Sequence, residues 1–217
     1  MQKAQPENYH CNMVEPEKTI PEHEDGAEVN VESSVDLASG SEAKSFYNSV
    51  RQKLLNINQW KEWAGALSAS FQLTDEKGQD IDAKPEKGNY FKIDIPAPGI
   101  VTGEGYDWVK IEEVKEETEQ DCEYTAIRVR PAPSPVNPNP DVAHFYTDEA
   151  TSNFIVRRDG TKVTAGVYGR NEKPNVGHAD TVIDKVRNAI VGSGAVSGFS
   201  KLQWKALVSG LLSAKKD

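Results

Sequence analysis

The chain has 217 residues, of which 37% are hydrophobic, and a formal net charge of −9. Residues 1–40 carry −7 of that charge, because they hold nine acidic side chains against two lysines. With a pI near 5.1 and no basic stripe, the chain lacks the positive surface that nucleic-acid binding requires. It also lacks a run of about 18 apolar residues, so we expect no membrane span.

The acidic N-terminus has few large apolar side chains and contains Pro6, Pro16 and Pro21. Such a segment buries too little surface to offset the entropy lost on ordering it. The sequence therefore predicts a disordered tail over residues 1–25 and a single domain over residues 26–217. The tail is also a surface that a partner protein could contact.

Two cysteines are too few for a disulfide framework. Cys11 falls in the predicted tail, so we expect no bridge to Cys122, and sparse cysteine is typical of a reducing compartment. The N-terminus has neither the positive start nor the apolar stretch of a secretory signal. These observations favour a cytoplasmic protein, or one whose leader has been removed.

The first elements are a strand and two helices. Apolar residues at every second position predict a strand over residues 28–37. From Ser41, the expected N-cap, to Ile57, apolar residues recur at three- and four-residue steps, which predicts an amphipathic helix. A second short helix follows over residues 59–67.

Strand-like segments fill the middle of the chain. In residues 106–114 the alternation shifts by one position at Val114. Five prolines in residues 131–140 exclude a helix or a central strand there and indicate a stiff surface loop. Asp159-Gly160, between two alternating runs, predicts a hairpin. The predicted strands cover residues 69–74, 89–95, 106–114, 124–130, 152–158 and 162–168.

The C-terminal part is predicted to be helical but interrupted. Residues 181–191 have helical spacing, and Ser200 with Gln203 resembles a capping box that would start the last helix. Between these segments, helix-weakening glycines stand at Gly192, Gly194 and Gly198.

The predicted order is one strand, two short helices, six strands and a C-terminal helix. It includes a QWKEW segment that holds Trp60 and Trp63. This order resembles that of the helix-grip superfamily. This superfamily (SRPBCC) includes START, polyketide-cyclase and birch-allergen domains. The resemblance covers about residues 28–214. It implies an α+β fold in which a curved antiparallel sheet of about seven strands grips the C-terminal helix, often around an apolar cavity. The glycines depart from the family, whose last helix is usually continuous.

No catalytic or metal-binding motif is present. The chain has no Gly-x-Ser-x-Gly sequence and no complete phosphate-binding loop. Its four histidines lack the spacing of metal ligands. We therefore assign no catalytic residue, no metal and no cofactor.

The candidate ligand-binding side chains are aromatic or polar. The segment from His144 to Ser152 connects the proline loop to the next predicted strand. One interpretation is that its polar side chains donate hydrogen bonds into a pocket. The other is an ordinary loop with one aromatic side chain in the core. For the tryptophans, core packing is the favoured interpretation, and the lining of a cavity is the alternative. The candidates are Trp60, Trp63, Trp108, His144, Tyr146 and Arg170.

Arg128 and Arg130 share one face of a predicted strand. We expect them to pair across strands with Glu112 or Glu113. The alternative is that their guanidinium groups bind the carboxylate of a ligand.

The resemblance implies non-catalytic binding of a hydrophobic small molecule or lipid between the sheet and the C-terminal helix. A first alternative is a cyclase- or hydratase-like enzyme on the same fold, with His144, Tyr146 and Asp107 as its first candidates. A second alternative is an interaction or scaffolding module with a filled core and the acidic tail as its contact. Polar residues that converge on a pocket would favour the enzyme.

Overall fold

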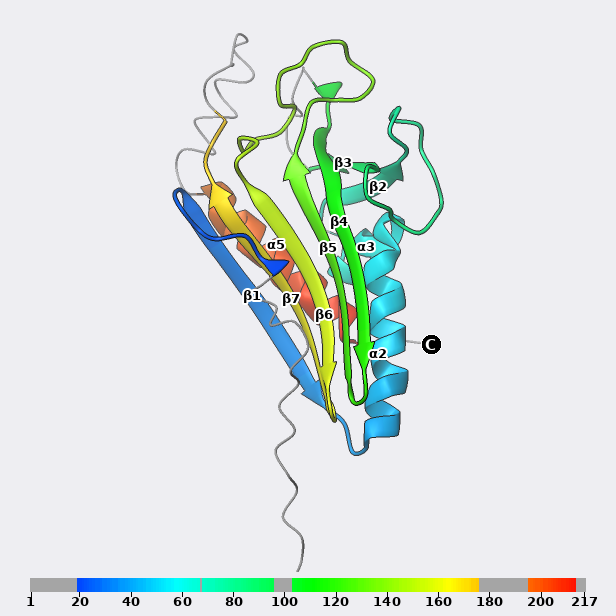
Figure 1. The fold of residues 1–217 in the computed structure, drawn as a ribbon. Helices are drawn as coiled ribbons and strands as arrows, with labels where there is room; N and C mark the ends of the chain where they lie inside the picture. The colour runs from blue at the N-terminus through cyan, green and yellow to red at the C-terminus, as the bar shows by residue number, and fades with distance from the viewer. Residues whose placement is uncertain (1–18, 67, 96–102, 176–194, 214–217) are drawn as a thin grey trace, which may run out of the picture.

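The computed structural model describes residues 19–66, 68–95, 103–175 and 195–213, the last range with side chains only from residue 201. Figure 1 shows the arrangement of its elements. In chain order they are β1 (Ala27–Asp36), α2 (Gly40–Leu55), η1 (Ile57–Gln59), α3 (Trp60–Ala64), β2 (Ser70–Thr74), β3 (Tyr90–Asp94), β4 (Asp107–Glu119), β5 (Cys122–Pro131), β6 (Thr151–Asp159), β7 (Lys162–Glu172) and α5 (Ala195–Leu211).

Within the described residues, seven strands form one antiparallel sheet in the order β1-β7-β6-β5-β4-β3-β2. β6 and β7 form the predicted hairpin, and Gly160 in its turn has a φ of +57° that glycine adopts at little cost. The sheet is curved, and α2 and α5 lie on one of its faces (Figure 1). We call this the inner face and the opposite one the outer face. The predicted helix-grip α+β fold is confirmed.

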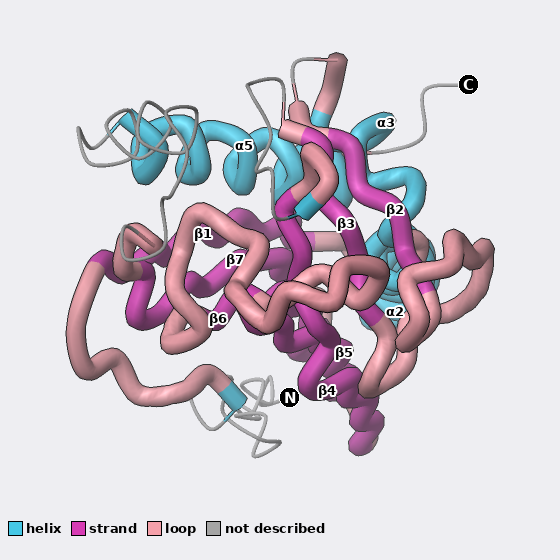
Figure 2. Tube along the Cα trace, turned by 90° about the horizontal axis from the view of Figure 1, so that it is seen from above, coloured by secondary structure: helices cyan, strands magenta, loops and turns pink. Residues whose placement is uncertain are grey.

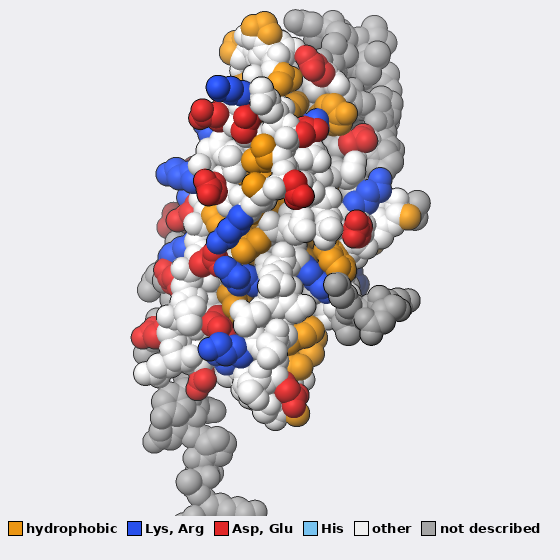
Figure 3. Space-filling view, turned by 90° about the vertical axis from the view of Figure 1, so that its right-hand side faces the viewer, with side chains coloured by type: hydrophobic (Ala, Val, Ile, Leu, Met, Phe, Trp, Pro, Cys, Tyr) orange, Lys and Arg blue, Asp and Glu red, His pale blue; other side chains and the backbone are white. Residues whose placement is uncertain are grey.

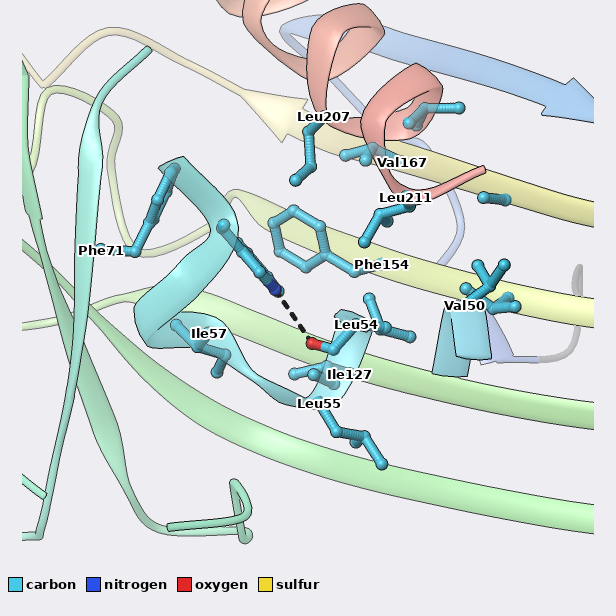
Figure 4. Close-up of a cluster of buried hydrophobic side chains, with 14 of the residues drawn as sticks. Val50, Leu54, Leu55, Ile57, Phe71, Ile127, Phe154, Val167, Leu207 and Leu211 are labelled. Carbon is cyan, nitrogen blue, oxygen red and sulfur yellow. Dashed lines mark hydrogen bonds between the residues drawn. The ribbon is translucent and has the colours of Figure 1, made fainter. Parts of the chain in front are cut away.

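The hydrophobic core lies between the inner face and the helices. Alternate side chains of each strand point to this face, because successive residues of a strand project to opposite sides. Figure 4 shows Leu54 of α2, Phe154 of β6 and Leu211 of α5 directed toward one another. Burial of each such side chain contributes roughly 1.5–3 kcal/mol. The strand residues of the core include Phe71, Phe91, Val109, Ile111, Ile127, Val129, Phe154, Val156, Val163, Ala165 and Val167.

The phase shift predicted in the fourth strand is a β-bulge. Between Ile111 and Glu113 the register of β4 against β5 shifts by one residue. Glu112 is therefore the extra residue of the bulge. The shift returns Val114 to the inner face, where it packs against the core.

The N-cap of α2 is Ser39, so the prediction of Ser41 is wrong. Ser39 has an extended backbone, with φ −149° and ψ 158°, and its hydroxyl accepts a hydrogen bond from the Glu42 N–H at 3.3 Å. This is the geometry of an N-cap. Ser41 already lies in the first turn of the helix.

α5 is one helix from Ala195 to Leu211 and passes through both Gly198 and Ser200. The predicted capping box at Ser200 is therefore wrong, because this residue lies inside the helix. A glycine in a helix costs about 1 kcal/mol, which the burial of the apolar residues of α5 offsets. The helix expected over residues 181–191 lies outside the described residues.

The C-terminal end of α5 is held by α2 and α3. The ammonium group of the buried Lys53 donates hydrogen bonds at 3.4, 3.1 and 2.6 Å to the carbonyl oxygens of Gly210, Leu211 and Ser213. A cation is favourable there because the end of a helix carries partial negative charge. A Cβ atom on Gly210 would overlap the Trp63 carbonyl, so glycine permits the close approach of α3 and α5.

The predicted pairing of the arginines on β5 is confirmed on the outer face. Arg128 Nε lies 3.1 Å from a Glu112 carboxylate oxygen, and Arg130 Nε lies 2.5 Å from the other one. Arg128 also pairs with Glu113 at 3.1 Å. These guanidinium groups therefore bind the sheet's own carboxylates.

Residues 19–25, which fall in the segment predicted as a tail, lie against the outer face. The Asn171 side-chain oxygen accepts hydrogen bonds from the backbone N–H groups of Glu24 at 2.8 Å and Asp25 at 3.3 Å. Ile20 packs against an outer-face cluster that includes Tyr124. Residues 1–18 lie outside the described residues, so the predicted tail over residues 1–25 stays a prediction.

Cys122, the first residue of β5, is disulfide-bonded. The chain has one other cysteine, Cys11, which lies outside the described residues. The expectation that Cys122 forms no bridge is therefore wrong.

The face shown in Figure 3 carries acidic and basic side chains interspersed with each other, so neither sign of charge dominates it. Among the described helices, none combines the length and the apolar character that a bilayer crossing requires.

Candidate functional site

Trp60 belongs to the packed core beneath the C-terminal part of α5. It is fully buried, and its indole N–H donates to the Leu54 carbonyl at 3.0 Å, the dashed line in Figure 4. Its ring lies 5.3, 5.8 and 4.6 Å, between centroids, from the rings of Phe71, Phe91 and Phe154. These contacts fill the space around the indole with protein side chains.

Trp63 positions α5. Its side chain is partly buried, and the Lys53 ammonium lies 4.5 Å from the centre of its ring. A cation over an indole face is attracted by the negative centre of the ring. Trp63 and Lys53 together thus hold the C-terminal end of α5 in place.

Trp108 and Arg170 lie on the outer face of their strands. Trp108 alternates with the core residue Val109, and its indole N–H donates to the Gly103 carbonyl at 3.1 Å. Arg170 forms an ion pair with Glu28 at 3.3 Å and donates to the Asn30 side chain at 2.8 Å. Neither side chain points into the space between the sheet and α5.

The structure brings His144, Tyr146 and Asp107 together at one end of the sheet, where β4 and β6 begin and β7 ends. Figure 2 views the molecule from this end, with the loops in front and α5 along one side. The buried Asp107 carboxylate accepts a hydrogen bond from the Phe145 N–H at 3.1 Å. His144 Nδ1 accepts from the Tyr146 N–H at 2.9 Å, so this nitrogen carries no proton.

The structure adds Glu172, which was not among the predicted residues. Between the pairs Ala27–Glu172 and Val29–Gly169, β7 has one residue more than β1, which makes a β-bulge. Asn171 lies in this bulge with a φ of +56°, a conformation that asparagine tolerates better than most residues. The extra residue turns Glu172 from the outer face to the inner face.

Gly169 provides the room for this carboxyl group. A Cβ atom on Gly169 would overlap Glu172 Oε1 and would lie 3.2 Å from the Val29 side chain. Val29 alternates with Val31 and Val35, which pack against the core, so both groups lie on the inner face. Glu172 is thus folded back against Gly169 on the inner face, within reach of the charge of Lys201 on α5.

Burial dominates the electrostatics of Glu172. The residue is 3% exposed, and this desolvation raises its pKa to about 7. The Tyr146 hydroxyl beside it and the charges of Lys201 and Arg170 lower the pKa by less than burial raises it. Among the described residues, Glu172 Oε2 makes no hydrogen bond of good geometry, and the Tyr146 hydroxyl is the donor group beside the carboxyl. The buried carboxyl therefore has an acceptor atom available to a ligand.

This end of the sheet can accept and donate protons or hydrogen bonds, but the described residues hold no group of three or more His, Cys, Asp or Glu side chains suited to a metal. The carboxyl of Glu172 and the phenol of Tyr146 are its reactive groups. They converge from β7 and from the loop before β6.

Sequence alternation places Glu172 incorrectly. It lies an odd number of positions after Val167, so simple alternation assigns it to the outer face, and Gly169 to Glu172 has the composition of a polar turn. The only signal for the bulge is an asparagine near the end of an alternating run. The bulge can be recognised only from the register of β1 against β7, which the sequence does not show.

No family model matches the sequence, and no curated protein matches it. Hypothetical protein jhp0584 from Helicobacter pylori is 16% identical, with 84% of this chain and 86% of that chain covered and a TM-score of 0.44. Major latex-like protein 151 from Panax ginseng is 10% identical, with coverages of 80% and 98% and a TM-score of 0.32. The di-domain ARO/CYC StfQ from the steffimycin biosynthetic pathway is 12% identical, with coverages of 85% and 50% and a TM-score of 0.39. All three scores are below 0.5, so the fold assignment rests on the sheet order and helix packing described above.

Proposed function

We propose that the chain binds a small, largely apolar molecule between the inner face of the sheet and the N-terminal half of α5. The polar end of the molecule would lie at Glu172 and Tyr146. The main support for the proposal is that the Glu172 carboxyl is buried and that, among the described residues, its Oε2 atom makes no hydrogen bond of good geometry.

We place the ligand beneath the N-terminal half of α5 because the core beneath its C-terminal part is filled. Beneath the C-terminal part of α5, Leu207 and Leu211 are fully buried with Trp60 and Phe154. Trp204, one turn nearer the N-terminus, is only partly buried and packs by its edge on Phe154, with 5.2 Å between ring centres. Trp204 thus marks the boundary between the packed core and the proposed site.

The energetics of burial support a functional role for Glu172. An unpartnered buried polar group costs roughly 1–3 kcal/mol, and an apolar residue in its place would avoid this cost. Two features keep the carboxyl in place, the bulge at Asn171 and the absence of a side chain at Gly169. A ligand that donates a hydrogen bond to Oε2 would remove the cost.

Native mass spectrometry of the full chain purified from its source host tests the proposal. We expect a retained small molecule in the wild type and a smaller bound fraction in Gly169→Ala, where the new methyl group displaces the Glu172 carboxyl. Gly40→Ala is the matched control, because nothing lies within 4 Å of a Cβ atom there. If the wild type carries no molecule and binds none from a panel of hydrophobic compounds, the proposal fails.

A second candidate function is acid–base catalysis on the bound molecule, as in a cyclase or hydratase. The observation that favours it is the pKa of Glu172, raised to about 7 by burial. A general acid or base is most effective when its pKa lies near the working pH. Conversion of a retained molecule by the wild type but not by Glu172→Gln would support catalysis, and recovery of the molecule unchanged from both would leave binding alone.

We further infer from the disulfide at Cys122 that the protein works in an oxidising compartment. Disulfides persist there and are rare in the cytoplasm, so this inference departs from the location that the composition favours. A partner for the acidic tail stays a proposal. Loss of a co-purifying protein on deletion of residues 1–25 would support it.

A further inference from the structure

We propose that the polar end of the bound molecule is a protonated amine, held by the Glu172 carboxylate and oriented by the Tyr146 hydroxyl. This inference rests on the function proposed above and adds the chemical class of the ligand. Its basis is the geometry and the charges around Glu172.

The geometry calls for a hydrogen-bond donor. Glu172 Oε1 lies against the backbone of Gly169, and among the described residues Oε2 makes no hydrogen bond of good geometry, although the Tyr146 hydroxyl lies beside the carboxyl. An ionised carboxylate accepts hydrogen bonds and does not donate them. A ligand carboxylate would bring a second negative charge to a buried one, which is strongly unfavourable. An ammonium group supplies both the missing donor and the opposite charge.

In the part of the chain that the structure describes, the cations that act on Glu172 leave this position open. Arg170, on β7, lies on the outer face and is held by Glu28 of β1 and by Asn30. Lys201, on α5, is exposed to solvent. Both act on Glu172 through their charge, but neither makes an ion pair with it within 4.0 Å, and burial outweighs them.

The charge balance predicts how binding depends on pH. Among the described residues, the groups that act on Glu172 are the Tyr146 hydroxyl from the loop and the charges of Arg170 from β7 and Lys201 from α5, and with them its pKa is about 7. An amine requires the carboxylate, so below pH 7 each bound amine must first displace a proton. Amine affinity should fall up to about tenfold for each pH unit below 7 and level off above it. A neutral alcohol has no such requirement.

Three probes that share one ring system test the proposal: 2-(2-naphthyl)ethylamine, 2-(2-naphthyl)ethanol and 2-naphthylacetate. Their affinities for the full chain are measured by isothermal titration calorimetry at pH 6 and pH 8. We expect the amine to bind most tightly at pH 8 and more weakly at pH 6, with the alcohol unchanged between the two.

Glu172→Gln keeps the shape of the side chain and removes its charge. It should weaken amine binding about 10- to 100-fold, the range for hydrogen bonds to charged groups, and leave alcohol binding within a factor of about two. Glu62→Gln, at an exposed position of α3, is the matched control and should change neither affinity. Tyr146→Phe tests the site a second time and should weaken amine binding less than Glu172→Gln does.

The outcomes separate the two proposals. Equal affinities of the wild type and Glu172→Gln for the amine, with the alcohol still bound, would overturn the amine assignment and leave small-molecule binding intact. Tighter binding of 2-naphthylacetate than of the amine would also overturn the amine assignment and leave small-molecule binding intact. If none of the three probes binds and the protein from its source host retains no molecule, the proposed function itself is overturned.

Discussion

Replacement of Glu172 by glutamine should stabilise the protein at alkaline pH and change little at acidic pH. In the folded chain, burial raises the pKa of Glu172 from an ordinary 4.5 to about 7. Between these two values the folded protein keeps a proton that the unfolded chain has released. The free energy of unfolding therefore falls as the pH rises from 4.5 to 7, and it stays lower above pH 7.

The size of the effect follows from the shift. One pKa unit corresponds to 1.36 kcal/mol, so a rise from 4.5 to about 7 corresponds to about 3 kcal/mol. Glutamine has no proton to lose and escapes this cost. We expect the difference in unfolding free energy between Glu172→Gln and the wild type to be about 3 kcal/mol more favourable to the variant at pH 8.5 than at pH 4.5.

Urea denaturation of both proteins at several pH values, with the disulfide intact, measures this difference. Other titrating groups act on both proteins alike and cancel in the comparison. Glu62→Gln, at an exposed position of α3, is the control and should show a difference that does not vary with pH. A difference for Glu172→Gln that is equally flat from pH 4.5 to 8.5 would refute the claim that this carboxyl is buried at a cost.

Three further predictions concern the helix grip and the disulfide. Lys53→Met should lower the unfolding free energy by roughly 2–3 kcal/mol, because three carbonyl oxygens at the end of α5 lose a charged donor; a loss below about 0.5 kcal/mol in urea denaturation would contradict this role. Gly210→Ala should cost more than about 3 kcal/mol, since its Cβ would overlap the Trp63 carbonyl, whereas Gly40→Ala should be neutral. Thermal melts of the two glycine variants make the comparison, and similar melting temperatures would refute it. Reduction of the full chain should raise its intact mass by two hydrogens and Cys122→Ser should abolish this change, so an unchanged wild-type mass would exclude the bridge.

The fold was predictable because the sequence patterns that indicate its strands and helices are local and periodic. Alternation identified the strands, and the bulge in β4 explains the shift of phase that the sequence shows at Val114. The resemblance to the helix-grip superfamily then supplied the position of the C-terminal helix. The charged pairs of Arg128 and Arg130 followed from alternation within β5 alone.

The errors concern features that depend on contacts distant in sequence. Ser39 and Ser41 both flank the start of α2, and only the extended backbone at Ser39 distinguishes them. The low helix propensity of the glycines before Ser200 predicted a break there. Packing against the sheet stabilises α5 as one helix through Ser200. In these cases a local preference of about 1 kcal/mol or less was outweighed by tertiary structure.

The candidate site was only partly predictable. His144 and Tyr146 follow the proline loop and lie where a strand begins, which made them visible in the sequence. Glu172 was hidden because a bulge reverses the face to which it points. The tryptophans attracted attention by their size, yet Trp60 packs in the core and Trp108 lies on the outer face.

The most direct test of the central claim is a carbon-13 NMR titration of the Glu172 side-chain carboxyl in the full chain, with and without 2-(2-naphthyl)ethylamine. We expect a pKa of about 7 in the free protein and a clearly lower value when the amine is bound. An ordinary carboxyl pKa that the amine leaves unchanged would contradict both the burial of this group and its role in binding.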